Sequence, residues 1–263
     1  MNQGGTLSRR ALLTTAALGL TLLATSAAAR LPWRGYLSAE TLDTTLVVPP
    51  PPAPDSATAQ ADRAAFLASR ALEGTPRWNM AIVDLKEADI LQNLSCAIGA
   101  DLNPLKMRHL TGLLIRMAPD VSRAVSRPKH LYGRPRPYLV DEGTICTARS
   151  KGLARSPDYP SGHATWSWAV GLVMAELVPE RSTQILTRAR AFGESRIVCG
   201  VHNASSVAAG RINATSVVAA LHGSPAFRED MAEARVELAR ALKHPRPPQG
   251  CEAEAEALAT PLD

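Results

Sequence analysis

Segments rich in alanine and leucine follow one another from Ser56 to Leu242, and the β-branched runs between them are short. Alanine and leucine favour helices, and a series of such segments is typical of helices packed on helices around one core. The chain has 263 residues, of which 46% are apolar, so it can bury one sizeable core. The sequence therefore predicts an all-α fold with a single compact helical domain.

Capping and stop residues set the expected bounds of the first three helices. One helix begins at Ser56 or Asp55 and stops at Gly74. A second is expected over about 79–97 and a third over about 104–117. The apolar positions expected on their inner faces are Ile82, Val83, Leu91 and Leu94 in the second helix and Leu110, Leu113, Leu114 and Met117 in the third.

The second half of the chain begins with a segment that disfavours regular structure. Residues 118–160 are rich in proline, glycine and arginine, and they predict a short helix followed by a long loop. Helices are expected to resume at Ser161, at about Arg181, after Gly200 and over 224–242. The stretch "HPRPPQG" then ends the predicted fold.

The N-terminal sequence "LSRRALLTTAALGLTLLATSAAAR" has the pattern of an export signal. Arg9 and Arg10 precede an apolar stretch of about 13 residues, and the small residues Ala27, Ala28 and Ala29 offer a cleavage site. The paired arginines suit a twin-arginine signal, whereas a membrane anchor or a buried helix is the alternative. We expect a signal peptide over 1–29 and a mature protein that is periplasmic or secreted.

The mature chain divides into three parts by composition. Residues 30–55 form a proline-rich lead that contains "VVPPPPAPDS", a stretch that cannot be helical. The helical domain is expected over 56–243, and 244–263 form a C-terminal tail. Removal of Arg9 and Arg10 with the signal would lower the net charge from +5 to +3.

A net charge this small does not indicate a nucleic-acid partner, and a local anion site is the better use of the cations. No later segment approaches the roughly 18 unbroken apolar residues of a spanning helix, so no membrane contact is expected of the mature form.

Four cysteines remain in the exported chain: Cys96, Cys146, Cys199 and Cys251. An even number favours disulfides in an oxidising compartment, and four cysteines allow three pairings. Their spacing does not suggest zinc. We expect Cys96 to pair with Cys146 and Cys199 with Cys251, so that the second bond ties the tail to the core. Four free buried thiols are the alternative.

Two stretches of the second half carry groups that suit an anion. "KHLYGRPRPYL" contains Lys129, Arg134 and Arg136, and its prolines predict a rigid extended segment. "YPSGHATW" opens a helix that Ser161 can cap, while Gly162 leaves its amide uncovered. A helix N-terminus with free N–H groups favours an anion. Taken alone, each stretch also fits a purely structural role. The first could be a solvated loop, and the second could be a helix capped by serine with a surface histidine.

Two histidines stand beside these groups. His163 follows Gly162 directly, and "SRIVCGVHNASSV" places Arg196 six residues before His202. Two residues six apart do not share a face of a continuous helix, but Gly200 is expected to interrupt the helix and turn both side chains inward. Cations, a helix N-terminus and two histidines together predict a phosphoryl site, in which one histidine attacks and the other protonates the leaving oxygen. No carboxylate cluster or P-loop is present in the sequence, so no metal or other cofactor is expected.

These stretches, in this order and spacing, resemble the three-part signature of the type 2 phosphatidic acid phosphatase superfamily, which also contains the vanadium haloperoxidases. The parts are Lys129-x6-Arg136-Pro137, Pro160-Ser161-Gly162-His163 and Ser195-Arg196-x5-His202. The chain is most similar to the bacterial class A non-specific acid phosphatases over essentially its whole mature length. That resemblance implies an exported, all-helical, metal-independent enzyme that is sensitive to vanadate, and it suggests a homodimer.

The resemblance also implies a role for each site residue. His202 would attack phosphorus and carry a phosphohistidine, and His163 would protonate the leaving alcohol. The remaining groups would bind the phosphate oxygens, and they are Lys129, Arg136, Ser161, Gly162 and Arg196. The expected substrates are small phosphate monoesters.

One position departs from the family pattern in a way that bears on activity. The family has an aspartate four residues after the nucleophilic histidine, where this chain has Ser206. Residues four apart share a helical face, so an acid there would hold the imidazole of His202, whereas a serine brings no charge. Loss of the triad aspartate lowers kcat about 10⁴-fold in serine proteases. We therefore expect reduced activity, and an increase in the Ser206→Asp variant.

Other departures lie close by. The chain has Asn203 in place of an aromatic residue, Pro157 and Asp158 in place of Gly-Ser, and Ala164 in place of threonine. Asp158 would weaken phosphate binding unless it turns outward. Whether Asp158 instead stands in for the missing acid stays open, because sequence does not give its distance from His202. The alternative function is a degenerate family member that binds phosphate or a phosphorylated ligand without turnover.

Overall fold

The structure, a computed structural model, describes residues 1, 34–260 and 262. The chain clusters into two units, Met1–Leu31 and Pro32–Asp263, and the second is described here. The predicted signal peptide, apart from Met1, lies outside the described residues. Within these residues all regular structure is helical, as the sequence predicts.

The α-helices have the following bounds: α1 Thr44–Val47, α2 Ala57–Ser69, α3 Pro76–Val83, α4 Ile90–Asn93, α5 Ser95–Ile98, α6 Arg108–Tyr132, α7 Lys151–Arg155, α8 Gly162–Leu177, α9 Ser182–Val198, α10 Ala204–Leu221, α11 Pro225–Ala241 and α12 Cys251–Leu258. Four 3₁₀ turns separate some of them, at Arg70–Leu72, Glu87–Asp89, Pro137–Leu139 and Pro179–Arg181.

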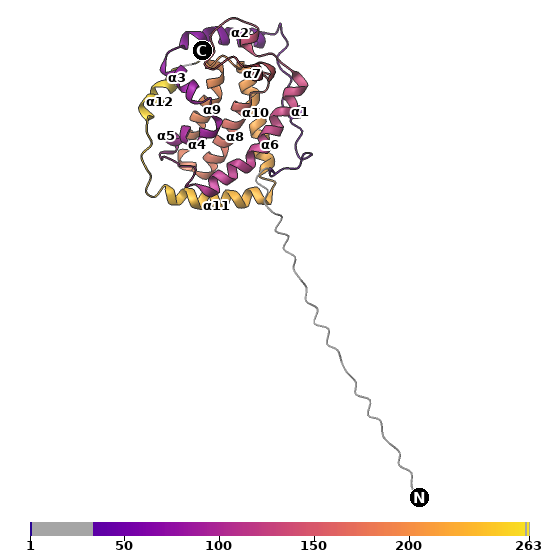
Figure 1. The fold of residues 1–263 in the computed structure, drawn as a ribbon, viewed down its shortest axis with the longest axis vertical. Helices are drawn as coiled ribbons and strands as arrows, with labels where there is room; N and C mark the ends of the chain where they lie inside the picture. The colour runs from indigo at the N-terminus through magenta and orange to yellow at the C-terminus, as the bar shows by residue number, and fades with distance from the viewer. Residues whose placement is uncertain (2–33, 261, 263) are drawn as a thin grey trace. The chain divides into compact units, whose positions relative to one another are not determined.

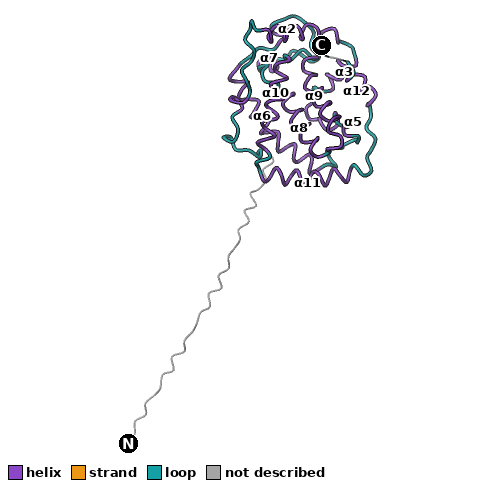
Figure 2. Tube along the Cα trace, turned by 180° about the vertical axis from the view of Figure 1, so that it is seen from behind, coloured by secondary structure: helices purple, strands orange, loops and turns teal. Residues whose placement is uncertain are grey.

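Helix α8 lies at the centre of the fold. It packs most extensively against α9 and α10, and α6 contacts both α8 and α10 (Figure 1). Helices α2 and α11 lie across opposite ends of these four, a placement that the reverse view repeats (Figure 2). Gly210 brings α10 close to the start of α8, because a Cβ there would lie 2.8 Å from the carbonyl oxygen of Ser161. The first turns of α10 therefore pack against the first turn of α8.

Several predicted helix bounds are confirmed. Ser56 caps α2 through its side chain. Ser161 caps α8 in the same way. Helix α2 ends at Ser69 and continues as a 3₁₀ turn to Leu72, so helical structure stops two residues before the predicted Gly74, where φ is +79°. The chain also breaks at Gly200 with φ +76° before α10 begins. These caps and breaks follow directly from side chains that satisfy helix-end N–H groups and from glycine's access to positive φ.

The predicted helix over 79–97 is wrong, because the chain forms α3, a 3₁₀ turn, α4 and α5 instead. Leu91 and Leu94 are buried as expected, but Ile82 and Val83 are 43% and 55% exposed. The break follows Asp84, which is fully buried and forms an ion pair of 2.6 Å with Arg188. A buried carboxylate needs such a partner, and the pairing ends α3 where periodicity alone would continue it.

The end predicted for the third helix at Met117 is also wrong. Helix α6 runs on to Tyr132 through Pro119 and Pro128, and its predicted inner face is buried. Proline lacks the N–H that would bond to the carbonyl four residues earlier. For Pro128 that carbonyl belongs to Ala124, and it accepts instead from Thr44 Oγ1 at 2.8 Å and Asn213 Nδ2 at 3.1 Å. Tertiary contacts therefore satisfy the group that the proline leaves free.

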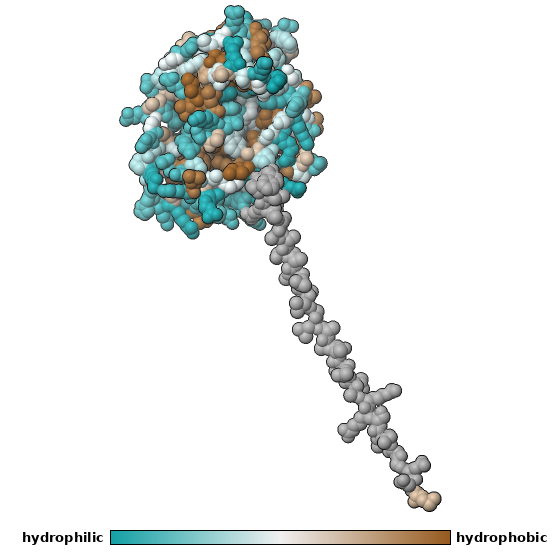
Figure 3. Space-filling model, in the orientation of Figure 1, coloured by the Kyte–Doolittle hydropathy of each residue, from teal (hydrophilic) through white to brown (hydrophobic). Residues whose placement is uncertain are grey.

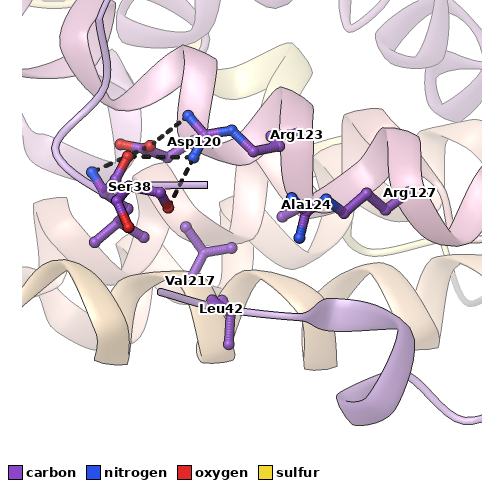
Figure 4. A pocket seen from close by; sticks show the side chains of 8 residues that line it. Ser38, Leu42, Asp120, Arg123, Ala124, Arg127 and Val217 are labelled. Carbon is purple, nitrogen blue, oxygen red and sulfur yellow. Dashed lines mark hydrogen bonds and ion pairs between the residues drawn. The ribbon is translucent and has the colours of Figure 1, made fainter. Parts of the chain in front are cut away.

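The segment before α1 is held against α6. The carboxylate of Asp120 accepts from the backbone amides of Tyr36 at 2.6 Å and Leu37 at 3.3 Å. Arg123 reaches both Asp120 and the carbonyl of Ser38, as Figure 4 shows. The lead that the sequence places before the helical domain is thus anchored to the core.

The predicted disulfide pairing is wrong. The bonds are Cys96–Cys251 and Cys146–Cys199. The amide of Cys146 donates to the carbonyl of Cys199 at 3.1 Å, so the loop after Leu139 lies along the end of α9. Sequence order does not reveal that this loop returns to α9, which is why the pairing could not be read from spacing.

The structure also corrects the prediction that the fold ends with "HPRPPQG". Helix α12 packs on α3, and Glu254 forms a 2.8 Å ion pair with Arg188 of α9. Together with the disulfide to Cys96, these contacts fix the C-terminal tail to the core.

On the face shown in Figure 3, apolar residues lie among hydrophilic ones. No helix of the described residues is both long and apolar enough to cross a membrane.

Candidate active site

Three cations predicted from sequence come together from different parts of the fold. Lys129 lies in the last turn of α6, Arg136 lies just before the Pro137–Leu139 turn, and Arg196 lies in the last turn of α9. Arg136 and Arg196 are buried, and Lys129 is partly buried. Lys129 is therefore not on the extended segment that the sequence predicted, because α6 continues through Pro128.

Burial lowers the pKa of all three cations, and repulsion by neighbouring cations adds to this shift for Lys129 and Arg196. Burial, followed by the charge of Arg136, lowers the pKa of Lys129 to about 7 and that of Arg196 to about 10. Burial also lowers the pKa of Arg136. A cluster of buried like charges is unfavourable without a counter-ion, and an anion bound among them would relieve the repulsion.

Arg196 shows where such an anion would bind. Its side chain is 3% exposed, and its Nε and Nη1 atoms are buried without a hydrogen-bond partner in the described part of the chain. A guanidinium is a donor at every nitrogen, and leaving such donors buried and unpaired costs stability. The N–H groups of these two nitrogens are therefore available to an oxyanion.

His202 lies in the turn between α9 and α10 with both ring nitrogens engaged. Its Nε2 is 3.0 Å from Arg136 Nη1, and its Nδ1 is 2.9 Å from Asp158 Oδ1. A guanidinium can only donate, so Nε2 accepts, and Nδ1 carries the proton that it donates to the carboxylate. Burial, followed by the charges of Arg136 and Lys129, lowers the pKa of His202 well below its usual value. The contacts assign a neutral imidazole with an unprotonated Nε2 beside the cations.

The sequence predicts that Asp158 weakens phosphate binding unless its side chain turns outward. In the structure the side chain turns inward. It is fully buried in the loop between α7 and α8. It also contacts Asn203 and Ser206, and Arg134 lies 3.5 Å from its Oδ2. Its carboxylate is therefore surrounded by donors.

Arg134, the remaining cation of "KHLYGRPRPYL", has partners of its own. Besides Asp158, it donates to Asp62 at 2.9 Å and to Ser205 at 2.8 Å. Arg134 therefore lies on the Asp158 side of His202, where it is paired with acids. It is not part of the group formed by Lys129, Arg136 and Arg196.

His163 lies in the first turn of α8 and faces an acid that sequence reasoning missed. Its Nδ1 is 2.9 Å from Glu87 Oε1, and its Nε2 is 3.2 Å from the carbonyl of Leu85. Burial and the charge of Arg196 lower the pKa of His163, and the contact with Glu87 opposes that shift. Glu87 follows no motif in "DLKEADI", so no signal in the sequence marks it.

Ser161 and Gly162 stand at the start of α8 as predicted. The Ser161 side chain is fully buried and caps the helix, and its backbone N–H donates to the carbonyl of Ser206 at 2.9 Å. Gly162 borders a cavity of about 370 Å³ that Glu87, Val121, Val125 and Trp166 also line. The cavity offers room for an organic group beside the general acid predicted at His163.

Comparisons with known proteins agree with this arrangement. The sequence profile of the PAP2 superfamily matches residues 107–229, which include all three predicted stretches. An acid phosphatase of Zymomonas mobilis is 40% identical over 202 residues, which is 76% of this chain and 76% of that protein. Non-specific acid phosphatases of Salmonella typhi and Providencia stuartii are 31% and 32% identical, over 81% and 78% of this chain and 86% and 85% of their own.

Proposed function

The chain belongs to the acid phosphatases of the PAP2 superfamily, and on this premise we propose that it hydrolyses small phosphate monoesters through a phosphohistidine at His202. The observation that carries the proposal is the pair of guanidinium nitrogens of Arg196 that are buried without a partner in the described chain, beside the other cations whose charges act on His202. Preorganised donors of this kind stabilise the charge that develops on a transferring phosphoryl group.

In the first step, Lys129, Arg136 and Arg196 bind the phosphate oxygens of the monoester. The Nε2 lone pair of His202 forms a bond to phosphorus while the bond from phosphorus to the ester oxygen breaks. The electron pair stays on that oxygen, and His163 gives it a proton, so that a neutral alcohol leaves.

In the second step, water attacks the phosphohistidine. His163, now neutral, takes a proton from the water as the bond from phosphorus to Nε2 breaks, and inorganic phosphate leaves. Glu87 stabilises the protonated state of His163 that the next turnover requires, because its carboxylate contacts Nδ1.

The experiment is a comparison of His202→Ala with His244→Ala, whose histidine is exposed in the segment after α11. With p-nitrophenyl phosphate at acidic pH, we expect the first variant to be inactive and the second to match the wild-type protein. Vanadate is expected to inhibit the wild-type protein and a chelator to leave it unchanged. Trapping of an acid-labile phosphoenzyme only when His202 is present would identify the nucleophile, and turnover in His202→Ala would contradict the assignment.

We further propose that the protein is exported, with a signal peptide over 1–29 and the catalytic domain over 56–243. Two disulfides among the described residues are typical of an oxidising compartment. N-terminal sequencing of protein recovered from a periplasmic fraction is expected to begin near Arg30. Export that persists after Arg9 and Arg10 are both changed to lysine would contradict the twin-arginine route. The suggested homodimer is checked by analytical ultracentrifugation.

A further inference from the structure

We propose that Asp158 is the residue that positions His202, and that it replaces, from the loop before α8, the acid that the family places at position 206. This inference rests on the proposed function. Asp158 contacts Nδ1 of His202, whereas Nε2 is the nitrogen proposed to attack phosphorus, so the role of Asp158 is to hold the imidazole in one tautomer and orientation. Ser206 then becomes a partner of the acid rather than a gap in the site.

The contact geometry supports an ionised carboxylate at Asp158. Its Oδ1 accepts from His202 Nδ1 at 2.9 Å and from the backbone N–H of Asn203 at 3.2 Å. Its Oδ2 accepts from Asn203 Nδ2 at 2.9 Å and from the Ser206 hydroxyl. Within the described chain, these contacts and that with Arg134 all offer donors, as an ionised carboxylate requires. Burial raises the pKa of Asp158, and the hydrogen bonds from Ser206 and Asn203 oppose this shift.

The loop that carries Asp158 is fixed on both sides. The Asp158 amide donates to the carbonyl of Arg134 at 2.8 Å, and Lys129 Nζ donates to the carbonyl of Pro157. Three residues later, the Ser161 amide donates to the carbonyl of Ser206 at 2.9 Å. A residue held by its neighbours' backbone contacts keeps its side chain in place, which is what a positioning role demands.

Compared with the family pattern, positions 158 and 206 have exchanged their serine and aspartate. The family pattern has a serine where this chain has Asp158 and an aspartate where this chain has Ser206. Here the two side chains are both fully buried and hydrogen-bonded to each other. One carboxylate can reach His202 from either position, whereas two would repel each other in the same buried space. This reverses the expectation that Ser206→Asp raises activity.

The carboxylate of Asp158 also stabilises the positive charge that develops on the imidazole of His202 during the reaction. Attack by Nε2 makes the imidazole ring positively charged while Nδ1 keeps its proton. The ring already lies among Lys129, Arg136 and Arg196, whose charges oppose a further cation. The charge of Asp158 at 2.9 Å from Nδ1 stabilises the ring as that charge develops. Serine alone at both positions would supply no such charge.

The test is a four-member cycle made of the wild-type protein, Asp158→Ser, Ser206→Asp and the double variant Asp158→Ser/Ser206→Asp. We expect Asp158→Ser to lower kcat by about 10²- to 10⁴-fold, as in other His–Asp pairs, with a small change in KM. Ser206→Asp alone is also expected to lower kcat. The double variant should recover kcat to within about tenfold of the wild-type protein, a coupling that independent sites do not show.

Two results would overturn the proposal. One is an Asp158→Ser or Asp158→Asn variant that keeps kcat within about threefold of wild type. The other is a folded double variant, checked by circular dichroism and thermal melting, that is no more active than Asp158→Ser. A merely structural role predicts that stability and activity fall together, whereas a positioning role predicts loss of kcat in a folded protein.

Nitrogen-15 NMR of His202 in the wild-type protein tests the contact without any variant. We expect a protonated Nδ1 and an unprotonated Nε2 in the neutral ring, and the opposite tautomer would overturn the proposal. This result is independent of turnover. An inactive wild-type protein that shows the expected tautomer would therefore count against the proposed function and not against the Asp158 contact.

Discussion

The guanidinium of Arg136 lies 3.0 Å from Nε2 of His202, and it also donates to the carbonyl of Val201 at 2.7 Å. Arg136 therefore holds the backbone of the turn that carries the proposed nucleophile and at the same time faces the nitrogen proposed to attack. Phosphate entering the site would take over the Nη1 contact with Nε2, which leaves the lone pair free to react.

Replacing Arg196 by methionine is expected to abolish phosphate binding without unfolding the protein. The two buried nitrogens of Arg196 have no hydrogen-bond partner in the described part of the chain, which lowers stability, so removal of the guanidinium should raise the free energy of unfolding by about 1–3 kcal/mol. Inorganic phosphate should raise the melting temperature of the wild-type protein but not that of the variant. A variant that is much less stable than wild type would mean that Arg196 serves the core instead.

The binding of phosphate should weaken as the pH rises through about 7. Burial, followed by the charge of Arg136, lowers the pKa of Lys129 to about 7, so Lys129 is charged below that pH and neutral above it. Loss of one cation should weaken inhibition by phosphate about tenfold, a change of ~1.4 kcal/mol. Because phosphate itself titrates near neutral pH, Lys129→Arg is the control: its arginine stays charged, and the wild-type loss should exceed the loss in this variant.

Glu87→Gln is expected to affect poor leaving groups more than good ones. The carboxylate of Glu87 lies 2.9 Å from His163 Nδ1 and raises the tendency of that ring to be protonated. An alkyl leaving group needs the proton of His163, whereas a nitrophenolate leaves without it. The measurement is kcat/KM over a series of phosphate esters of rising leaving-group pKa. An equal loss across the series would show that Glu87 does not act through proton transfer.

Loss of each disulfide should lower stability, but only loss of Cys146–Cys199 should also lower kcat. Removing Cys96–Cys251 by serine substitution should lower the free energy of unfolding by about 2–5 kcal/mol with little change in kcat, because it ties α12 to α5. Removing Cys146–Cys199 should lower kcat as well, because Cys199 lies three residues before His202. Urea unfolding and phosphatase assays on both serine pairs check this, and equal effects on kcat would contradict it.

Local signals predicted some parts of this fold and long-range contacts decided the others. Ser161 and Gly200 mark their helix ends because caps and positive φ act within a few residues of the chain. By contrast, α6 passes through Pro128 because Thr44 and Asn213 satisfy a carbonyl from far away in sequence. No local pattern contains that information.

The candidate site divides in the same way. The three motif stretches name the cations and histidines, and the structure brings these side chains together. The acids that act on the two histidines, Asp158 and Glu87, belong to loops whose return to the site depends on packing. The residue expected to hold His202 was sought four positions along a helix, whereas the carboxylate comes from 44 residues earlier.

The contact that compensates for Pro128 makes the segment around Thr44 part of the framework of the candidate site. Thr44 reaches into the middle of α6 and bonds to the carbonyl of Ala124, just over one turn before Lys129. Thr44 therefore supports the part of α6 that carries Lys129, and the segment that contains it is more than a spacer. A shortened protein that began at α2 would lack the hydrogen bond from Thr44 to α6. Removal of the residues before α2 would therefore weaken the support of Lys129.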